Sequence, residues 1–284
     1  MSRIQDILAK AERDGTTRRP TLTPALPPQM PSIAPYDGSA ALDPDYMASP
    51  LPPMDHVITE TRPVVPAVSD VRTATPTLHP ALVAAINPHS AVAEQYRAIR
   101  TRLAHRDGHG PLRTIMVTSP AAGDGKSVTA ANLALAMAQE IQQQVLLVDG
   151  DLRTPSTHSL FGISGTPGIA DVLLGEASLE DVLVHLPDLH LTILPAGNAP
   201  QFPTELLGSN AMRRVMDVLR ARFDRILLDV PAVTPLADAG TVAPLADGVV
   251  LVVRAGATKR PSLDQALNSF TDGHVVGMVL NEVR

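Results

Sequence analysis

The 284-residue chain contains no cysteine and no tryptophan, and aromatic residues make up only 2% of it. The absence of cysteine excludes a disulfide scaffold and thiolate chemistry. With so few aromatic side chains, the core must be built from leucine, valine, isoleucine and alanine. The nine histidines lack the spacing of metal ligands, and a net charge of −6 offers no footprint for nucleic acid.

Long apolar runs are also missing. No run reaches the roughly 18 residues of a membrane-spanning helix, and the N-terminus has no apolar signal core. We therefore expect a cytoplasmic protein that touches a membrane only through a partner.

Proline is unevenly distributed, because 15 of the 27 prolines lie between Pro20 and Pro88. Proline fixes φ and removes a donor, so residues 15–86 are predicted to form a disordered linker. A proline-motif docking site is the alternative. Before the linker, residues 1–14 are predicted to form a short amphipathic helix, with a frayed terminus as the alternative. Its apolar residues at helical spacing are Ile4, Ile7, Leu8 and Ala11.

From residue 87 to residue 284, short apolar strands alternate with helical segments. This alternation predicts an α/β domain built on a doubly wound, mostly parallel sheet with helices on both faces. The predicted strands are 114–118, 145–149, 190–194, 225–229, 248–253 and 275–280. The predicted helices are 88–104, 126–140, 169–174, 178–184, 204–222 and 260–270.

A glycine-rich turn between the first of these strands and the helix after it carries the clearest chemistry. Its Gly-Lys-Ser ending lets backbone N–H groups surround a phosphate, with Lys126 at the outer phosphates and the Ser127 hydroxyl available to Mg²⁺. The pattern departs from G-x-x-x-x-G-K-[ST] because Pro120 replaces the first glycine. The predicted nucleotide-binding residues of this turn are Ala122, Gly123, Asp124, Gly125, Lys126, Ser127 and Val128.

Two further strands end in aspartates, namely Asp149 and Asp151 after one strand and Asp229 after another. Ligands of open parallel sheets bind at the carboxyl ends of strands, which is where all three fall. A single such aspartate is commonly a helix or turn cap. Together with the glycine-rich turn they predict a Mg-nucleotide site. Lys126 and the three aspartates are the catalytic candidates, and Ser127 and Asp229 are the candidates for holding the metal.

These motifs resemble those of the bacterial tyrosine kinases, the P-loop type tied to exopolysaccharide and capsule export. Gly123–Ser127 is similar to the Walker A loop of that family. Leu146–Arg153 resembles its Asp-x-Asp-x-Arg motif, and Ile226–Pro231 resembles its Walker B motif. The resemblance covers about residues 85–284. Residues 4–12 also look like the first helix of the subgroup associated with exosortase-type polysaccharide loci.

The resemblance implies a P-loop NTPase fold that uses ATP/ADP and Mg²⁺ and acts as a protein-tyrosine autokinase. It also implies a homo-oligomer, peripheral to the inner membrane, that regulates a membrane polysaccharide co-polymerase. Glu94, Arg97 and Arg100 match the family's self-association motif. The resemblance favours Asp149 as the base-like residue and Asp151 as the Mg²⁺-associated one, although sequence alone does not separate them.

Two more residues are nucleotide-site candidates with open alternatives. Arg153 is expected to support the aspartates or to meet a neighbouring subunit, and its alternative is a surface arginine. Asn281, at the end of the last predicted strand, is in place to read an adenine edge, and its alternative is a turn asparagine.

The chain departs from the family in one respect, because no tyrosine follows the glycine-rich turn. The family's tyrosine-rich tail therefore has no counterpart, and two functions stay open. In the first, the protein is a tyrosine kinase that acts on Tyr46, on Tyr36 or on other proteins. In the second, it is a nucleotide-switched regulator of the same export system. A partition-type ATPase is disfavoured because Ala121 and Ala122 replace that branch's early lysine.

Overall fold

The computed structural model describes residues 72–104, 112–270 and 274–282. The chain divides between residues 60 and 61, and all described residues belong to the second part. The predicted helix 1–14 and the predicted linker up to residue 71 lie outside the described residues.

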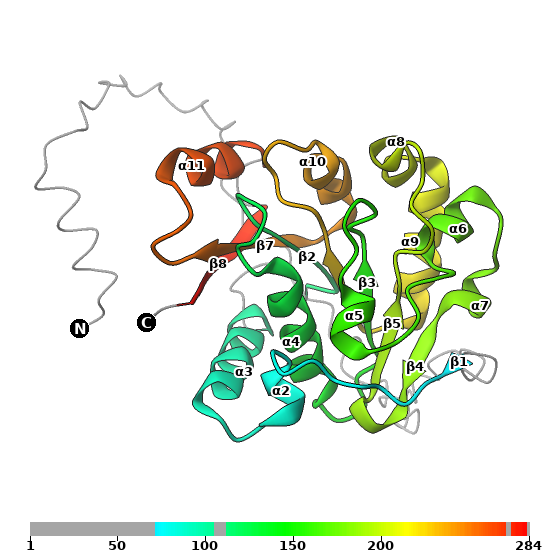
Figure 1. Ribbon diagram of the computed structural model, residues 1–284, viewed down its shortest axis with the longest axis horizontal. Coiled ribbons are helices and arrows are strands. Elements are labelled where there is room, and N and C mark those ends of the chain that lie inside the picture. The colour runs from blue at the N-terminus through cyan, green and yellow to red at the C-terminus, as the bar shows by residue number, and fades with distance from the viewer. Residues whose placement is uncertain (1–71, 105–111, 271–273, 283–284) are drawn as a thin grey trace, which may run out of the picture. The chain divides into compact units, whose positions relative to one another are not determined.

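In the part of the chain that the structure describes, eight strands form one sheet in the order β1-β4-β5-β3-β6-β2-β7-β8 (Figure 1). All neighbouring strands are parallel except β4 and β5. The strands are β1 Arg72–Thr73, β2 Thr114–Thr118, β3 Val145–Asp149, β4 Val184–Leu186, β5 Leu191–Leu194, β6 Arg225–Asp229, β7 Gly248–Arg254 and β8 Val275–Asn281.

Helices connect the strands and cover both faces of the sheet. None of the helices in the described ranges is long and apolar enough to cross a membrane. The helices are α2 Val83–Ile86, α3 Ala91–Ala104, α4 Lys126–Ala138, α5 Thr157–Phe161, α6 Ile169–Leu174, α7 Leu179–Val182, α8 Pro203–Leu207, α9 Asn210–Arg222, α10 Asp238–Val242 and α11 Arg260–Asn268.

Two cores lie on the two faces of the sheet, as strand β2 shows. Successive side chains of a strand point to opposite faces, so Met116 enters one core while Ile115 and Val117 enter the other. The core around Met116 includes buried residues of α6, α9 and α10, and the other includes residues of α2, α3 and α4 (Figure 1). This arrangement confirms the predicted doubly wound, mostly parallel sheet and explains why its strands are apolar throughout.

The six predicted strands are present with bounds that agree within one residue. The predicted helix 204–222 is two helices, because α8 ends at Leu207 and Ser209 caps a new helix, α9, where its hydroxyl accepts from the Met212 N–H at 3.1 Å. The predicted helix 178–184 ends at Val182, since Val184 already belongs to the antiparallel strand β4.

The predicted linker extends too far, because residues 72–86 belong to the folded domain. They contribute β1 and α2, and Leu82 and Ala84 are buried. Asn132 on α4 holds this segment: its Oδ1 accepts from the Ala84 N–H and its Nδ2 donates to the Ala81 carbonyl, both at 2.9 Å. The density of prolines does not predict this boundary, because contacts with α4 order residues 72–86.

Candidate functional site

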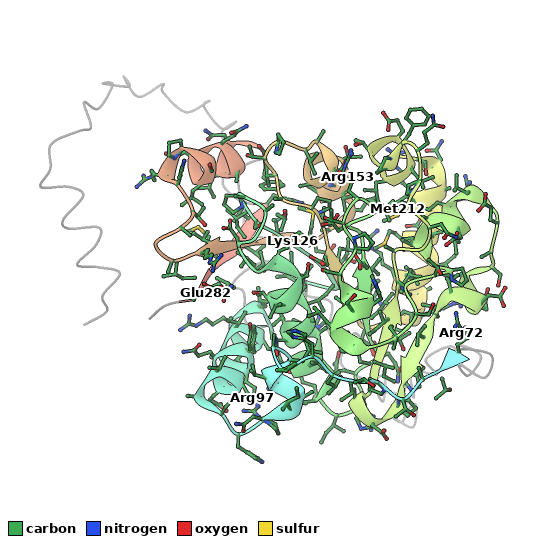
Figure 2. All side chains as sticks on the ribbon, in the orientation of Figure 1. Arg72, Arg97, Lys126, Arg153, Met212 and Glu282 are labelled. Carbon is green, nitrogen blue, oxygen red and sulfur yellow. The ribbon has the colours of Figure 1, made fainter. Side chains whose placement is uncertain are left out.

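The strand order brings the three sequence motifs to one edge of the sheet. Strands β3, β6 and β2 are direct neighbours, and Asp149 pairs in register with Asp229. The glycine-rich turn follows β2 and leads into α4, so it lies beside both aspartates. Lys126, the first residue of α4, lies at this edge (Figure 2).

The glycine-rich turn has the geometry of an anion-binding loop. Gly123 and Gly125 have φ values of 86° and 92°, in the left-handed region that favours glycine. Gly125 is the N-cap of α4, and no side chain caps the helix there. The first N–H groups of a 13-residue helix, together with its dipole, therefore favour a negatively charged ligand at this point.

The ammonium group of Lys126 lies among the acids. Its Nζ is 2.8 Å from Asp151 Oδ2, 3.4 Å from Asp229 Oδ1 and 3.1 Å from the Ser127 hydroxyl. Burial alone would lower the pKa of Lys126, but the nearby carboxylates outweigh burial and raise the pKa above its usual range. Lys126 therefore stays charged and acts as the cation of this cluster.

The two aspartates at the strand ends are fully buried and influence each other. Asp149 accepts from the backbone N–H groups of Asp151, Ser156 and Thr157 at 3.0–3.2 Å. Burial, and then the charge of Asp229, raise the pKa of Asp149 to about 7. Burial also raises the pKa of Asp229. Both carboxyls are thus more basic than free aspartates.

Asp151 differs from these two acids. Its carboxylate accepts from the N–H of Thr154 at 2.9 Å and from the hydroxyl of that residue at 3.2 Å. Burial acts to raise its pKa, but the charge and hydrogen bond of Lys126 and the bonds from Thr154 outweigh burial, so the pKa of Asp151 lies below its usual range. Asp151 is therefore the ionised acid near neutral pH, whereas Asp149 can hold or release a proton there.

The residues present fit a magnesium ion. Asp229 Oδ2 is a buried carboxylate oxygen that has no hydrogen-bond partner, with Ser127 and Asp151 nearby. Among the described residues, no group of three or more His, Cys, Asp or Glu side chains forms a metal cage. Mg²⁺ needs none, because it commonly takes one or two carboxylates and completes its shell with waters and substrate phosphates.

Comparison with known proteins agrees with this geometry. The family described as AAA domain matches residues 112–270. Tyrosine-protein kinase YwqD of Bacillus subtilis is 35% identical over 202 residues, which cover 70% of this chain and 85% of that protein. The chain belongs to the bacterial tyrosine-protein kinase family.

Two more relatives extend the comparison. The succinoglycan biosynthesis transport protein ExoP of Rhizobium meliloti is 32% identical over 200 residues, which cover 69% of this chain and 25% of that protein. The crystal structure of the chimerical protein CapA2B2 is 28% identical and superposes with a TM-score of 0.69, over 75% of this chain and 93% of that one. The tyrosine-kinase family likeness thus extends over the described domain.

Arg153 of this tyrosine-kinase domain binds a residue that the sequence did not single out. Its Nε donates to Asp238 at 2.7 Å and its Nη2 donates to the Thr204 hydroxyl at 2.9 Å. Asp238 is fully buried at the start of α10. The expected support of the site's aspartates is therefore replaced by a pairing with a fourth acid. No local pattern identifies Asp238, because its partner lies 85 residues away.

Asn281, at the end of β8, lies against the glycine-rich turn. Its Nδ2 donates to the Asp124 carbonyl at 3.0 Å. A Cβ built on Gly125 would come within 2.1 Å of that same nitrogen, so this close approach requires glycine. Thr258 was not predicted from the sequence as a site residue, but its hydroxyl donates to Asp124 Oδ1 at 2.8 Å.

The residues predicted for self-association lie on α3, apart from the glycine-rich turn of the same chain; Figure 2 shows Arg97 away from Lys126. Arg97 pairs with Glu94, as their spacing predicts, and also bonds the Pro88 carbonyl. Arg100 donates to the Ala136 carbonyl at 2.7 Å.

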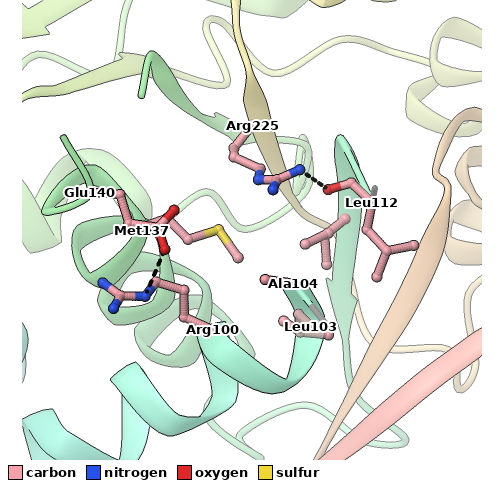
Figure 3. A pocket seen from close by; sticks show the side chains of 8 residues that line it. Arg100, Leu103, Ala104, Leu112, Met137, Glu140 and Arg225 are labelled. Atoms are coloured by element: carbon pink, nitrogen blue, oxygen red, sulfur yellow. Dashed lines mark hydrogen bonds and ion pairs between the residues drawn. The ribbon is translucent and has the colours of Figure 1, made fainter. Parts of the chain in front are cut away.

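Arg100 also lies 3.1 Å from Glu140, beside a small cavity at the far end of the sheet (Figure 3). Both arginines of the motif therefore have partners within the chain. On the predicted apolar stripe of α3, Leu103 is buried and Tyr96 and Ile99 are partly buried, whereas Val92 is exposed. Tyr36 and Tyr46 lie outside the described residues.

Proposed function

We propose that this protein binds and hydrolyses Mg-ATP at the carboxyl edge of the sheet and transfers the γ-phosphoryl group to tyrosine, as a kinase of exopolysaccharide export. The observation that carries the proposal is the position of Lys126 Nζ, between Asp151 and Asp229 at the turn that opens α4. Phosphoryl transfer depends mainly on positioning and on charge neutralisation, which this arrangement supplies.

Each residue has a role in this proposal. Lys126 and the N–H groups of the turn hold the outer phosphates, while Ser127 and Asp229 hold Mg²⁺ directly or through water. The metal, when bound, neutralises charge on the phosphates. Asp149 accepts the proton of the tyrosine hydroxyl. Its pKa of about 7 supports this role, because a general base works best when its pKa is near the ambient pH. ADP and phosphotyrosine are the products.

The Lys126→Met variant tests the proposal. Removing a charge that faces phosphates in a partly desolvated site is expected to weaken Mg-ATP affinity about 10²-fold or more and to abolish hydrolysis. Arg214→Met is the control, because it removes an exposed cation from α9. Mg-ATP binding to Lys126→Met that equals the unaltered protein in calorimetry would refute the site.

The polysaccharide system is supported by the ExoP likeness, since that relative is named for succinoglycan biosynthesis transport. A homo-oligomer joined through Glu94, Arg97 and Arg100, and a membrane co-polymerase as partner, extend the same proposal. Arg97→Ala combined with Arg100→Ala is expected to lower the oligomer mass measured by light scattering in Mg-nucleotide. Glu140→Gln is the control, because it removes the negative charge that pairs with Arg100 within the chain. If the control loses as much oligomer mass as the double variant, the loss reflects packing of the helix within the chain and not a contact between subunits.

The phosphoacceptor decides between the kinase and the nucleotide-switch functions. Tyr46 and Tyr36 are the proposed acceptors because both are flanked by carboxylates in the proline-rich segment, whereas Tyr96 packs in the core of α3 and α4. Mass spectrometry after incubation with Mg-ATP, with Lys126→Met as control, is expected to find phosphate on Tyr46. If the protein hydrolyses ATP but neither tyrosine carries phosphate, two functions remain: a kinase that acts on other proteins, or a nucleotide-switched regulator.

A further inference from the structure

Asp124 is a buried acid inside the phosphate-binding turn. Its side chain is 3% exposed, although a carboxylate at this position repels the phosphates that the turn is to bind. A buried charge is tolerated when it is well hydrogen-bonded. Oδ2 accepts from the Ala121 N–H at 3.0 Å and Oδ1 accepts from the Thr258 hydroxyl at 2.8 Å. The carboxylate therefore serves to shape the turn.

Thr258 is itself held in a closed turn just after β7. Its hydroxyl accepts from the Arg254 N–H at 2.8 Å while it donates to Asp124, and its own N–H donates to the Arg254 carbonyl at 3.1 Å. Asn281 adds a third connection, because its Nδ2 bonds the Asp124 carbonyl. The ends of the two outermost strands on this side of the sheet, β7 and β8, thus both hold one residue of the nucleotide turn.

We propose that Thr258 is a positioning residue for the nucleotide: through Asp124, its hydroxyl holds the glycine-rich turn in the conformation that binds phosphate. The turn contains two glycines in the left-handed region, and glycine is the most flexible residue. A turn that is ordered in advance does not have to be ordered when the ligand binds. The inference rests on the proposed binding of Mg-ATP.

The bound phosphates need the same turn conformation before and during phosphoryl transfer. Loss of this preorganisation is therefore expected to raise KM and to leave kcat nearly unchanged. Thr258→Val keeps the shape of the side chain and removes the hydroxyl with both of its hydrogen bonds. We expect Mg-ATP and Mg-ADP to bind about 10-fold more weakly, with kcat within about twofold. Thr258→Ser restores the hydroxyl and is expected to restore affinity to within about twofold.

The experiment measures nucleotide affinity by calorimetry and KM and kcat by hydrolysis, on the full chain, with thermal unfolding of the nucleotide-free proteins. Thr241→Val is the matched control, since its hydroxyl bonds the Ala237 carbonyl within α10. Affinity of Thr258→Val equal to that of the parent would overturn the inference and leave the proposed function standing. So would a fall in kcat and melting temperature at unchanged KM, which indicates a structural role. Failure of the parent itself to bind Mg-ATP would overturn both.

Discussion

Two groups of buried acids lie at the same edge of the sheet, and they are neutralised to different degrees. In the first, which we call the lysine cluster, Asp149, Asp151 and Asp229 share the single ammonium of Lys126. In the second, the arginine cluster, one acid, Asp238, has the guanidinium of Arg153 and the hydroxyl of Thr204 to itself. The lysine cluster is built from the ends of β3 and β6 and the start of α4, whereas the arginine cluster joins the loop after β3 to α8 and α10.

The difference separates a site that binds a cation from one that holds structure. The lysine cluster has more negative than positive charge, one carboxylate oxygen without a partner and two acids with raised pKa values. Such a group destabilises the folded protein until a further cation binds. Local destabilisation of this kind is typical of enzyme sites. In the arginine cluster every charge is already matched, so it joins the loop after β3 to α8 and α10.

The largest expected effect comes from Asp229→Asn, which reduces the excess negative charge of the lysine cluster. ATP hydrolysis is expected to fall about 10²-fold or more, because an oxygen that faces Mg²⁺ is lost. The nucleotide-free protein is expected to become more stable by about 1 kcal/mol, since burial penalises the charged form of Asp229 and raises its pKa, and a neutral amide does not carry that penalty. Hydrolysis assays and urea denaturation measure the two effects. A loss of stability would show that Asp229 is structural.

A substitution in the arginine cluster is expected to lower the stability of the protein rather than raise it. Arg153→Ala leaves Asp238 fully buried with only the Thr204 hydroxyl, and we expect a loss of about 2–3 kcal/mol of unfolding free energy, since Arg153 is itself one-third exposed. The KM for Mg-ATP of the folded variant is expected to change less than about threefold. A larger rise in KM would instead make Arg153 a nucleotide ligand, as the sequence pattern predicted.

The smallest expected effect is the pH dependence of the nucleotide-free protein. Unfolded chains release the Asp149 proton near pH 3.8 and the folded protein releases it at about 7. Between these values the folded state binds more protons, so the free energy of unfolding falls as the pH rises. The raised pKa of Asp229 acts in the same direction, while Asp151, whose pKa is lowered, acts in the opposite sense only in acid.

From pH 6 to pH 8 we expect a fall of about 1.5 kcal/mol in the free energy of unfolding, measured in urea. The slope should be smaller in Asp149→Asn, and smaller in the parent when Mg²⁺ supplies the missing positive charge. If Asp149→Asn does not change the slope of the unfolding free energy against pH, other groups are responsible for the pH dependence.

Much of the fold was predictable because the signals are local. Strands β2, β3 and β6 are apolar at every central position, which is the pattern of strands buried on both faces, and the glycine-rich turn marks the start of α4. The short strands β1 and β4 and the helices α2, α5 and α10 were not predicted. They have two to five residues each, too few to show a period, and they are ordered by the parts of the domain that they join.

The sequence by itself determined which groups stand at the ends of β2, β3 and β6, and parallel strands necessarily bring those ends to one edge. It therefore predicted Lys126 and the three aspartates as one site. Only the tertiary structure decided the long-range partners: Arg153 with Asp238, Thr258 with Asp124, and Asn281 with the turn, separated by 85, 134 and 157 residues. Local patterning specifies an element and what it carries, whereas a hydrogen-bond partner depends on how separate loops meet after the sheet has formed.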